Sequence, residues 1–467
     1  MARTRPGVGV ATAVGITALC IIPGPRYVQA QSGVTECGRE GGADIIVGEV
    51  ASVANWQRVG DIDAFSWGVT FCNLGDEAGV FMANDDQHPV HAQNMYRLLD
   101  GRFEQIGLSW LPHAFFALSQ NQCGCGCTAM GGSTLGEGCS SPESASISGY
   151  QPNMGPRSEV NAHTGAFAFP FSYRGESGDF IYKRVQVHAA DLDVAQNQGA
   201  RYFAEDQVVS PDDALNGFQN NNASHRELVV ARTGSEWQAA LTGSTTREQP
   251  AIRAWAALDP TVMAADVQVP DDGLFVVAGK ATYAGAGVWQ YEYAIQNLNS
   301  HRCGGSFSVP IPNGAVVEGI GFHDVDYHSG EPFDLTDWAG VTDGGALRWT
   351  TGPFETDPNA NALRWGTLYN FRFTANREPM QGEVTIGLFR PGSPASVVAQ
   401  SLVPAWRFGD LDGDLDIDWV DYAGWPGCVT GPGSAHSGSP CAVFDHEPDG
   451  DVDMTDYAAF MYAFLEE

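Results

Sequence analysis

Basic residues are scarce in this chain. Its 467 residues include 24 lysines and arginines against 56 aspartates and glutamates, which gives a formal net charge of −32 at pH 7. A surface with such an excess of negative charge repels the phosphates of nucleic acids and the head groups of anionic lipids. The composition therefore predicts no nucleic-acid partner.

Long apolar runs are missing after the N-terminus. The first 30 residues combine Arg3 and Arg5 with an apolar stretch over 8–22 and small residues ending at Ala30, which is typical of a secretory signal peptide. No later stretch has the ~18 uninterrupted apolar residues of a membrane span. Cleavage near Gln31 removes three arginines and no acid, leaving 21 basic and 56 acidic residues and a net charge of −35. We expect a secreted or cell-surface, extracellular protein without a membrane span.

Several catalytic motifs are also absent. The chain contains no G-x-S-x-G, no H-E-x-x-H, no P-loop and no dinucleotide-binding fingerprint. Serine esterases, zincins and nucleotide-dependent enzymes therefore have no motif support. Glycosidases need only two carboxylates that the fold brings together, so a missing motif does not exclude them.

Nine of the ten cysteines follow residue 30. An odd number leaves at least one without an intramolecular partner. Four of them form a cluster without histidine, at spacings unlike those of zinc knuckles: Cys123, Cys125, Cys127 and Cys139. We favour disulfides from this cluster to Cys37, Cys72 or Cys303 over a metal site, and we expect a separate disulfide between Cys428 and Cys441.

Alternation of apolar and polar residues dominates the long central part of the chain. It is clearest over 289–296, 369–374 and 384–388, and clusters of Gly, Asn, Asp and Pro separate such stretches. Short strands between turn residues are typical of sandwiches and barrels. We predict a mainly β fold, with β-sandwich-type domains followed by a small α-helical C-terminal module.

The expected domain boundary lies near residue 260, where a predicted helix over 251–258 ends at Asp259-Pro260. We therefore divide the chain into four parts. These are the signal peptide (1–30), a cysteine-containing β-rich domain (31–260), a β-sandwich domain (261–405) and the small C-terminal module (406–467).

Two groups of polar residues in the β-rich part have a possible metal-binding or catalytic interpretation. The first is His323-Asp324-Val325-Asp326-Tyr327-His328, followed by Glu331 and Asp334; on a strand, Asp324, Asp326 and His328 share one face. We favour a solvated face that runs into a turn. The second is His88 with His91 and His113, where Pro89 favours a loop and local hydrogen bonds over ligation.

Four tryptophans allow two interpretations. Exposed on strands, they can stack on sugar rings, whereas burial in the core is the simpler account. They are Trp289, Trp338, Trp349 and Trp365.

The C-terminal part contains a tandem acidic repeat. The stretches 410–423 and 445–458 align without a gap, and acids recur at positions 1, 3, 5, 9 and 12, the spacing of a loop that wraps oxygen ligands around calcium. Position 7 supplies a backbone carbonyl in that geometry, so its side chain is free to point to water. The expected Ca²⁺ sites comprise Asp410, Asp412, Asp414, Asp416, Asp418 and Asp421, and then Asp445, Glu447, Asp449, Asp451, Asp453 and Asp456.

The alternation of these acids with apolar residues favours calcium loops over a solvated acidic tail. The sharp turn at position 6 falls on Leu415 in the first loop and on Gly450 in the second. A left-handed conformation costs a branched residue about 1–2 kcal/mol, so we expect the second site to be tighter. The helix after the first loop is predicted to end early, at Pro426-Gly427.

This duplicated loop-and-helix unit, with Asp421 and Asp456 at position 12, resembles the dockerin type I module. The resemblance implies docking onto a cohesin-like or cell-surface protein, often in the service of carbohydrate-degrading enzymes. The positions that carry recognition in the family are Trp419-Val420 in one repeat and Met454-Thr455 in the other, so the two halves are not interchangeable.

Two functions follow from the sequence. The leading hypothesis is a secreted modular protein with β-rich domains that bind or display, joined to a calcium-stabilised docking module. The alternative is an extracellular carbohydrate-active enzyme, active in polysaccharide breakdown and tethered through the same module. A concave site with two convergent carboxylates, roughly 5–10 Å apart, favours the enzyme.

Overall fold

The computed structural model describes residues 36–312, 314–343, 345–405, 407–412, 416–435, 441–447 and 449–466. The predicted signal peptide lies outside these ranges. Strands dominate and helices are short, except at the C-terminus, so the predicted mainly β fold is confirmed.

The first sandwich packs two antiparallel sheets around a core that includes Phe65, Trp67, Val69 and Phe71. One sheet has the order β1-β2-β10, with β8 also paired to β2, and the other has the order β13-β12-β11-β4-β5. The strands are β1 (Ile45–Val59), β2 (Ile62–Asn73), β4 (Val90–Leu99), β5 (Arg102–Leu108), β8 (Ser140–Glu143), β10 (Val185–His188), β11 (Arg201–Val209), β12 (Ala223–Thr233) and β13 (Glu236–Leu241).

The second sandwich repeats this plan with sheets β14-β15-β16-β21-β18 and β19-β20-β17-β22-β23. Aromatic side chains at alternate positions of β16 and β21 point into its core, where Tyr291 stacks on Phe373 with ring centroids 4.9 Å apart. The strands are β14 (Met263–Gln268), β15 (Leu274–Gly285), β16 (Val288–Asn297), β17 (Gly304–Pro310), β18 (Val317–His323), β19 (Ala339–Asp343), β20 (Ala346–Thr350), β21 (Thr367–Ala375), β22 (Pro379–Leu388) and β23 (Ser396–Pro404).

Core packing accounts for the tryptophans of this region. Trp338, Trp349 and Trp365 are buried, and Trp289 is partly buried against the core of the second sandwich. None of the four is therefore an open platform for a sugar ring.

Shorter elements connect the strands. They are β3 (Gly79–Val80), β6 (Leu111–Pro112), β7 (Thr134–Leu135), α1 (Ala145–Ser148), η1 (Gln151–Asn153), β9 (Met154–Gly155), η2 (Arg157–Glu159), α2 (Ala189–Leu192), α3 (Pro211–Asn216) and α4 (Arg253–Leu258). The helix predicted over 251–258 thus begins two residues later than expected.

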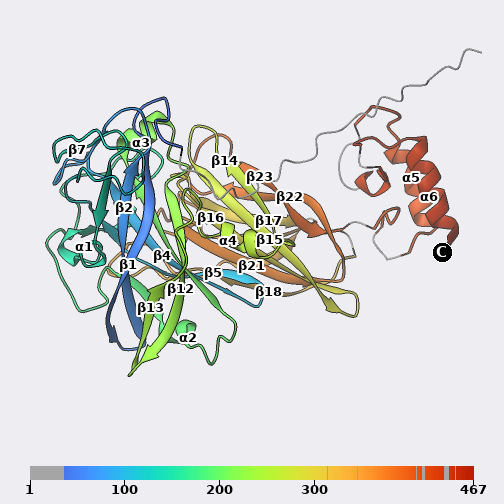
Figure 1. Ribbon diagram of the computed structural model, residues 1–467. Coiled ribbons are helices and arrows are strands. Elements are labelled where there is room, and N and C mark those ends of the chain that lie inside the picture. The colour runs from blue at the N-terminus through green and yellow to red at the C-terminus, as the bar shows by residue number, and fades with distance from the viewer. Residues whose placement is uncertain are drawn as a thin grey trace, which may run out of the picture. The chain divides into compact units, whose positions relative to one another are not determined.

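The two sandwiches meet face to face, and β5 contacts β16 and β21 across the seam (Figure 1). An apolar cluster fills much of this seam, including Tyr96 and Phe103 from the first sandwich and Ala294 and Leu368 from the second. As a result β4 and β11 are covered on both faces, by the core of their own sandwich and by the other sandwich. The described residues form one compact unit.

Polar side chains are buried in the same seam. The carboxylate of Glu205 on β11 accepts hydrogen bonds from Tyr96 Oη at 2.8 Å, from Ala251 N at 2.6 Å and from Gln296 Nε2 of the second sandwich at 3.1 Å. Burial, together with the Glu205 carboxylate, raises the pKa of Tyr96 well above its ordinary value. Such a network stabilises one fixed arrangement of the two sandwiches because every lost partner leaves a buried polar group unsatisfied.

The predicted disulfides to Cys37 and Cys72 and between Cys428 and Cys441 are present, whereas the alternative pairing with Cys303 is not formed. The cysteine cluster pairs with itself and with the N-terminal part of the first sandwich, and Cys303 is a buried free thiol. The four bonds are Cys37–Cys125, Cys72–Cys123, Cys127–Cys139 and Cys428–Cys441.

The C-terminal region has a small core of its own between α5 (Trp419–Cys428), η3 (Cys441–Phe444) and α6 (Met454–Glu466). Phe460 lies against the ring of Trp425 with centroids 5.4 Å apart. The predicted early end of the first helix was wrong, because α5 continues past Pro426 to Cys428. A proline in the last turn removes only one hydrogen bond, and the disulfide at Cys428 holds that turn. No helix among the described residues is long and apolar enough to cross a membrane.

We predict that Glu205→Ala destabilises the protein by about 2–4 kcal/mol, because it leaves several buried donors without an acceptor. The matched control is Glu227→Ala on β12, whose carboxylate is partly exposed and pairs with Arg201 at 2.8 Å. Its expected cost is about 0–1 kcal/mol. Chemical denaturation measures both, and equal losses in the two variants would contradict a stabilising role for the seam network.

Candidate metal centre

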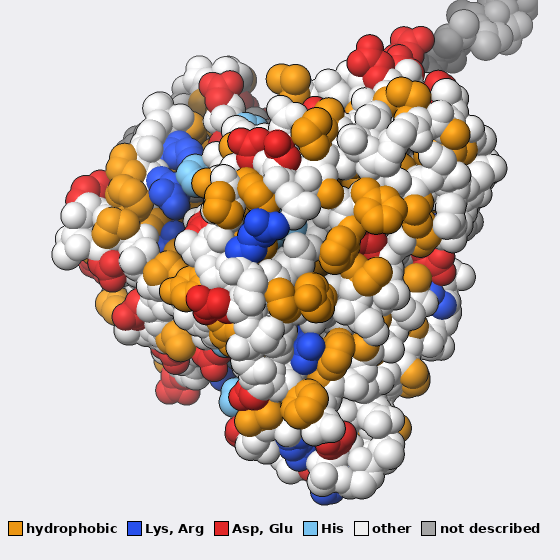
Figure 2. Space-filling view, turned by 90° about the vertical axis from the view of Figure 1, so that its left-hand side faces the viewer, with side chains coloured by type: hydrophobic (Ala, Val, Ile, Leu, Met, Phe, Trp, Pro, Cys, Tyr) orange, Lys and Arg blue, Asp and Glu red, His pale blue; other side chains and the backbone are white. Residues whose placement is uncertain are grey.

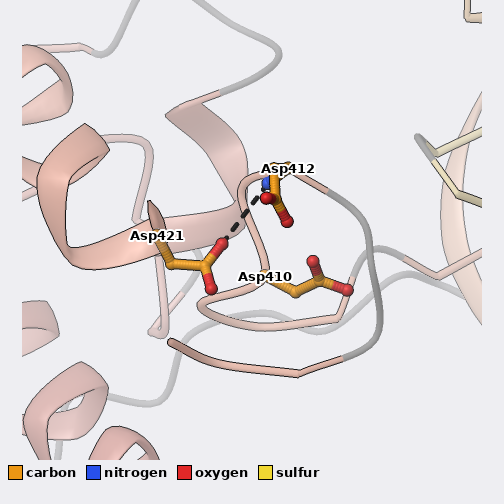
Figure 3. Close-up of side chains that lie close together, drawn as sticks. All are labelled: Asp410, Asp412 and Asp421. Atoms are coloured by element: carbon orange, nitrogen blue, oxygen red, sulfur yellow. Dashed lines mark hydrogen bonds between the residues drawn. The ribbon is translucent and has the colours of Figure 1, made fainter. Parts of the chain in front are cut away.

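The first acidic loop brings its carboxylates together. Ligand atoms of Asp410, Asp412 and Asp421 lie within 4.8 Å of one another, and a second group joins Asp416 and Asp418 to the same Asp421. Figure 3 shows the first group, in which Asp421 reaches from the start of α5 toward the loop that carries the other two. Both Asp410 and Asp421 are buried, so their mutual repulsion is weakly screened by water. This cluster of oxygens is suited to a hard cation.

The two repeats share one hydrogen-bonding pattern. In the first, Asp421 Oδ1 accepts from Leu411 N at 2.5 Å and Asp421 Oδ2 accepts from Asp418 N at 2.8 Å. In the second, Asp456 accepts from His446 N at 2.7 Å and from Asp453 N at 2.8 Å. The aspartate at position 12 thus fastens the start of each loop to its end. The alignment seen in the sequence corresponds to a structural repeat.

Each loop also caps the helix that follows it. Asp418 Oδ1 accepts from Val420 N at 2.6 Å, and Asp453 Oδ1 accepts from Thr455 N at 2.7 Å. An acidic side chain at this position satisfies a free helix N–H and lies at the positive end of the helix dipole. The aspartate at position 9 of each repeat therefore belongs to the acidic loop and also caps the helix that follows it.

The second loop gathers Asp451, Asp453 and Asp456 within the same 4.8 Å limit. Asp451 differs from the sequence-based expectation for position 7, since it is buried and does not turn to water. Its Oδ2 accepts from Gly433 N, whereas its buried Oδ1 has no hydrogen-bond partner. An unpaired carboxylate oxygen beside two further carboxylates is the kind of atom that a cation satisfies.

The remaining acids of the second loop are arranged differently. Asp445 accepts from Asp449 N at 3.2 Å and from Gly450 N at 3.0 Å, which closes the turn rather than joining the cluster. Glu447 and Asp449 are also outside the three-residue group. Desolvation and the neighbouring carboxylates of Asp456 and Asp449 raise the pKa of Glu447, so negative charge does accumulate there.

Position 6 of the second loop has the expected left-handed backbone. Gly450 has φ of +87°. In the first loop Asp414, a predicted ligand, and Leu415, at position 6, lie outside the described residues. The predicted ranking of the two sites stays a prediction.

Apolar side chains project from the starts of both helices. Trp419 and Met454 occupy the same position in the two repeats and are 70% and 72% exposed. Val420 beside Trp419 is also exposed. These side chains are therefore accessible to another molecule.

The polar group around His328 has a structural role. The strand β18 ends at His323, so Asp324, Asp326 and His328 do not share a strand face. His328 Nε2 lies 2.8 Å from Leu108 O, and Trp110 Nε1 donates to His328 O at 3.0 Å, so this segment docks the second sandwich onto the first. Burial lowers the pKa of His328 to about 4 and raises that of Asp324 to about 6.

The rings of His88, His91 and His113 each contact another group of the protein. The ring of His91, on β4 and not in a loop, lies 2.9 Å from the Asp206 carboxylate. Burial lowers the pKa of His91, but the Asp206 carboxylate raises it, and the net shift of this pKa is upward. His88 contacts backbone carbonyls, and His113 stacks on Phe171 at 3.9 Å. Among the described residues, none of these histidines belongs to a three-ligand group.

Two open cavities lie on the β-rich part. One, of about 610 Å³, includes Tyr150, Phe171 and Glu176. The other, of about 360 Å³, has the carboxylates of Glu248 and Asp266 in its wall. The wall of the 610 Å³ cavity comes from one stretch, residues 150–176, whereas that of the 360 Å³ cavity comes from several segments between Asn220 and Leu298; no sequence motif marked either. On the face drawn in Figure 2, apolar side chains form several separate groups rather than one continuous patch.

The second cavity does not have the features of a glycosidase site. Glu248 pairs with Arg39 at 2.8 Å, and Asp266 pairs with Arg253. Both carboxylates are therefore held in ion pairs with arginine rather than left free in the cavity wall. Comparison with known protein-family models and with curated proteins gave no match.

We predict that Gly450→Ala destabilises the C-terminal region by about 1 kcal/mol, because a Cβ is strained in the left-handed conformation. No atom lies within 4 Å of the added Cβ, so the effect isolates backbone strain. Gly427→Ala is the matched control, since it has equal space and no positive φ. Thermal unfolding followed by circular dichroism measures both, and a harmless Gly450→Ala would exclude strain at this turn.

Proposed function

We propose that this chain is an extracellular modular protein whose residues 406–467 form a calcium-stabilised, dockerin-like docking module. The observation that carries the proposal is the matched pair of loops, in which Asp421 and Asp456 make equivalent hydrogen bonds beside converging carboxylates. The β-sandwiches would then be the part that binds or displays.

Calcium is the proposed ion because the donors are all oxygens. Ca²⁺ accepts six to eight oxygen ligands in flexible geometry, whereas zinc prefers nitrogen and sulfur. Asp410, Asp412, Asp416, Asp418 and Asp421 would hold one ion, and Asp451, Asp453 and Asp456 would contribute to the second. A bound ion supplies the positive charge that lets these carboxylates lie close together.

The docking role is supported by the exposed side chains of the module. Trp419 and Met454 are at the positions that carry recognition in the dockerin family, and both project into solvent. The proposed partner is a cohesin-like or cell-surface protein. Because the two side chains differ in shape, we infer that one repeat dominates the contact.

The proposed extracellular location is supported by the four disulfides, since such bonds persist in oxidising compartments. Binding or display ranks above the enzymatic alternative because the carboxylates of the 360 Å³ cavity are paired with arginine. A carbohydrate remains the partner class that the dockerin resemblance suggests for the sandwiches.

We predict that EDTA unfolds the C-terminal module in the full-length protein, because its carboxylates repel one another without the cation. The measurement is tryptophan fluorescence of Trp425, which is buried against Phe444 and Phe460, compared with a Trp425→Phe control. Calcium should restore the signal, and calorimetry should resolve two binding events. A signal that is unchanged by EDTA would refute the calcium assignment.

We predict that Trp419→Ala weakens calcium-dependent binding to a purified cohesin domain by at least about tenfold, as expected for a central aromatic contact. Tyr462→Ala is the control, since this residue is 67% exposed on α6 but lies outside the loop positions. Surface plasmon resonance with and without calcium measures both. Equal affinities of the wild type and Trp419→Ala would exclude the first repeat as the docking surface.

A further inference from the structure

A small pocket beside the seam of the two sandwiches is lined by arginine. Arg157 of the first sandwich and Arg364 and Arg390 of the second share its wall with the free thiol of Cys303. The chain has a net charge of −32, so three arginines without an acidic partner are unexpected. Among the described residues, no carboxylate oxygen lies within 4.0 Å of their guanidinium nitrogens.

Arg364 is held rigidly and still has free donors. Its side chain is buried, with the residue only 4% exposed, and Nη2 donates to Pro358 O at 3.0 Å and Ala360 O at 2.9 Å. The guanidinium lies over the ring of Phe333 at 3.8 Å. Its Nε and Nη1 have no hydrogen-bond partner. A buried guanidinium does not lose its proton, so these unpaired donors carry a full positive charge.

Arg390 adds a further unpaired donor. Its Nε is buried without a partner. The backbone brings it to Arg364 and Cys303 because Phe389 N donates to Cys303 O at 3.0 Å and Gly304 pairs with Leu363. The segments that carry Cys303, Arg364 and Arg390 therefore meet where β17 begins and β22 ends.

The carboxylates of Glu331 and Asp272, near the pocket, accept hydrogen bonds from backbone N–H groups. Both oxygens of the Glu331 carboxylate accept from backbone N–H groups, those of Arg157 and Ser158, and burial raises the pKa of Glu331. Asp272 accepts from His301 N at 3.1 Å and Arg302 N at 3.0 Å. Arg157 itself is satisfied by neutral oxygens, including Ser109 O at 2.6 Å and Gly366 O at 3.0 Å.

We propose that this pocket is a binding site for one small inorganic anion of about the size of chloride. The free donors are Arg364 Nε and Nη1 and Arg390 Nε. The cavity volume of about 20 Å³ suffices for a single water-sized particle. A water molecule would accept hydrogen bonds from the donors but would leave their positive charge uncompensated. An anion accepts the hydrogen bonds and also compensates the charge. The inference is independent of the calcium module.

The test measures melting temperature in sodium chloride against sodium gluconate at equal ionic strength and constant calcium. We expect a saturable rise of a few degrees that is specific to chloride and absent in Arg390→Gln. Arg348→Gln is the matched control, because Arg348 is an exposed arginine of the same sandwich. A rise that is equal in both salts, or that persists in Arg390→Gln, would overturn the proposal.

Two measurements on the unaltered protein keep the proposal testable if Arg390→Gln does not fold. In crystals grown with bromide, anomalous scattering should place one ion within hydrogen-bond reach of Arg364 and Arg390, and density for water alone would overturn the site. Alkylation of Cys303, followed by peptide mass spectrometry, should be slower in chloride than in gluconate. Equal alkylation rates would also count against it.

Discussion

The seam between the two sandwiches is the constraint on which the β-rich part depends. Glu205 and Arg157 of the first sandwich are buried there. Each also hydrogen-bonds to the second sandwich: Glu205 accepts from Gln296, and Arg157 donates to Gly366 O. Neither sandwich can leave the other without exposing these charged groups together with an apolar cluster. The seam also creates the arginine pocket, since Arg157 comes from one sandwich and Arg364 from the other.

Charge is distributed unevenly over this acidic protein. The C-terminal loops concentrate carboxylates, whereas the arginine pocket concentrates guanidinium groups that lack an acidic partner. Both arrangements are unfavourable alone because like charges repel and buried charges lose solvation. A cation in the loops and a small anion in the pocket would resolve the two problems separately. The proposed docking role would then use a module whose fold depends on the proposed ion.

Local patterns allowed part of the structure to be predicted. Alternation of apolar and polar residues around Tyr291 and Phe371 identified strands, because every second side chain of a strand points to the same, buried face. The strand β11 was missed because Glu205 and Gln207, which are polar, are buried in the seam. The role of His328 was missed for a related reason, because its partner Leu108 lies 220 residues away. Sequence distance hides such contacts even when each residue is noticed.

The sequence by itself determined the spacing of the acidic loops, the helices that follow them and the odd cysteine. Each of these depends on short-range geometry or on counting, as Gly450 at its turn and the free Cys303 illustrate. Only the tertiary structure decided which carboxylates converge, which cysteines pair and where arginines meet without acids. Those outcomes depend on the packing of distant strands, and packing is set by the whole chain.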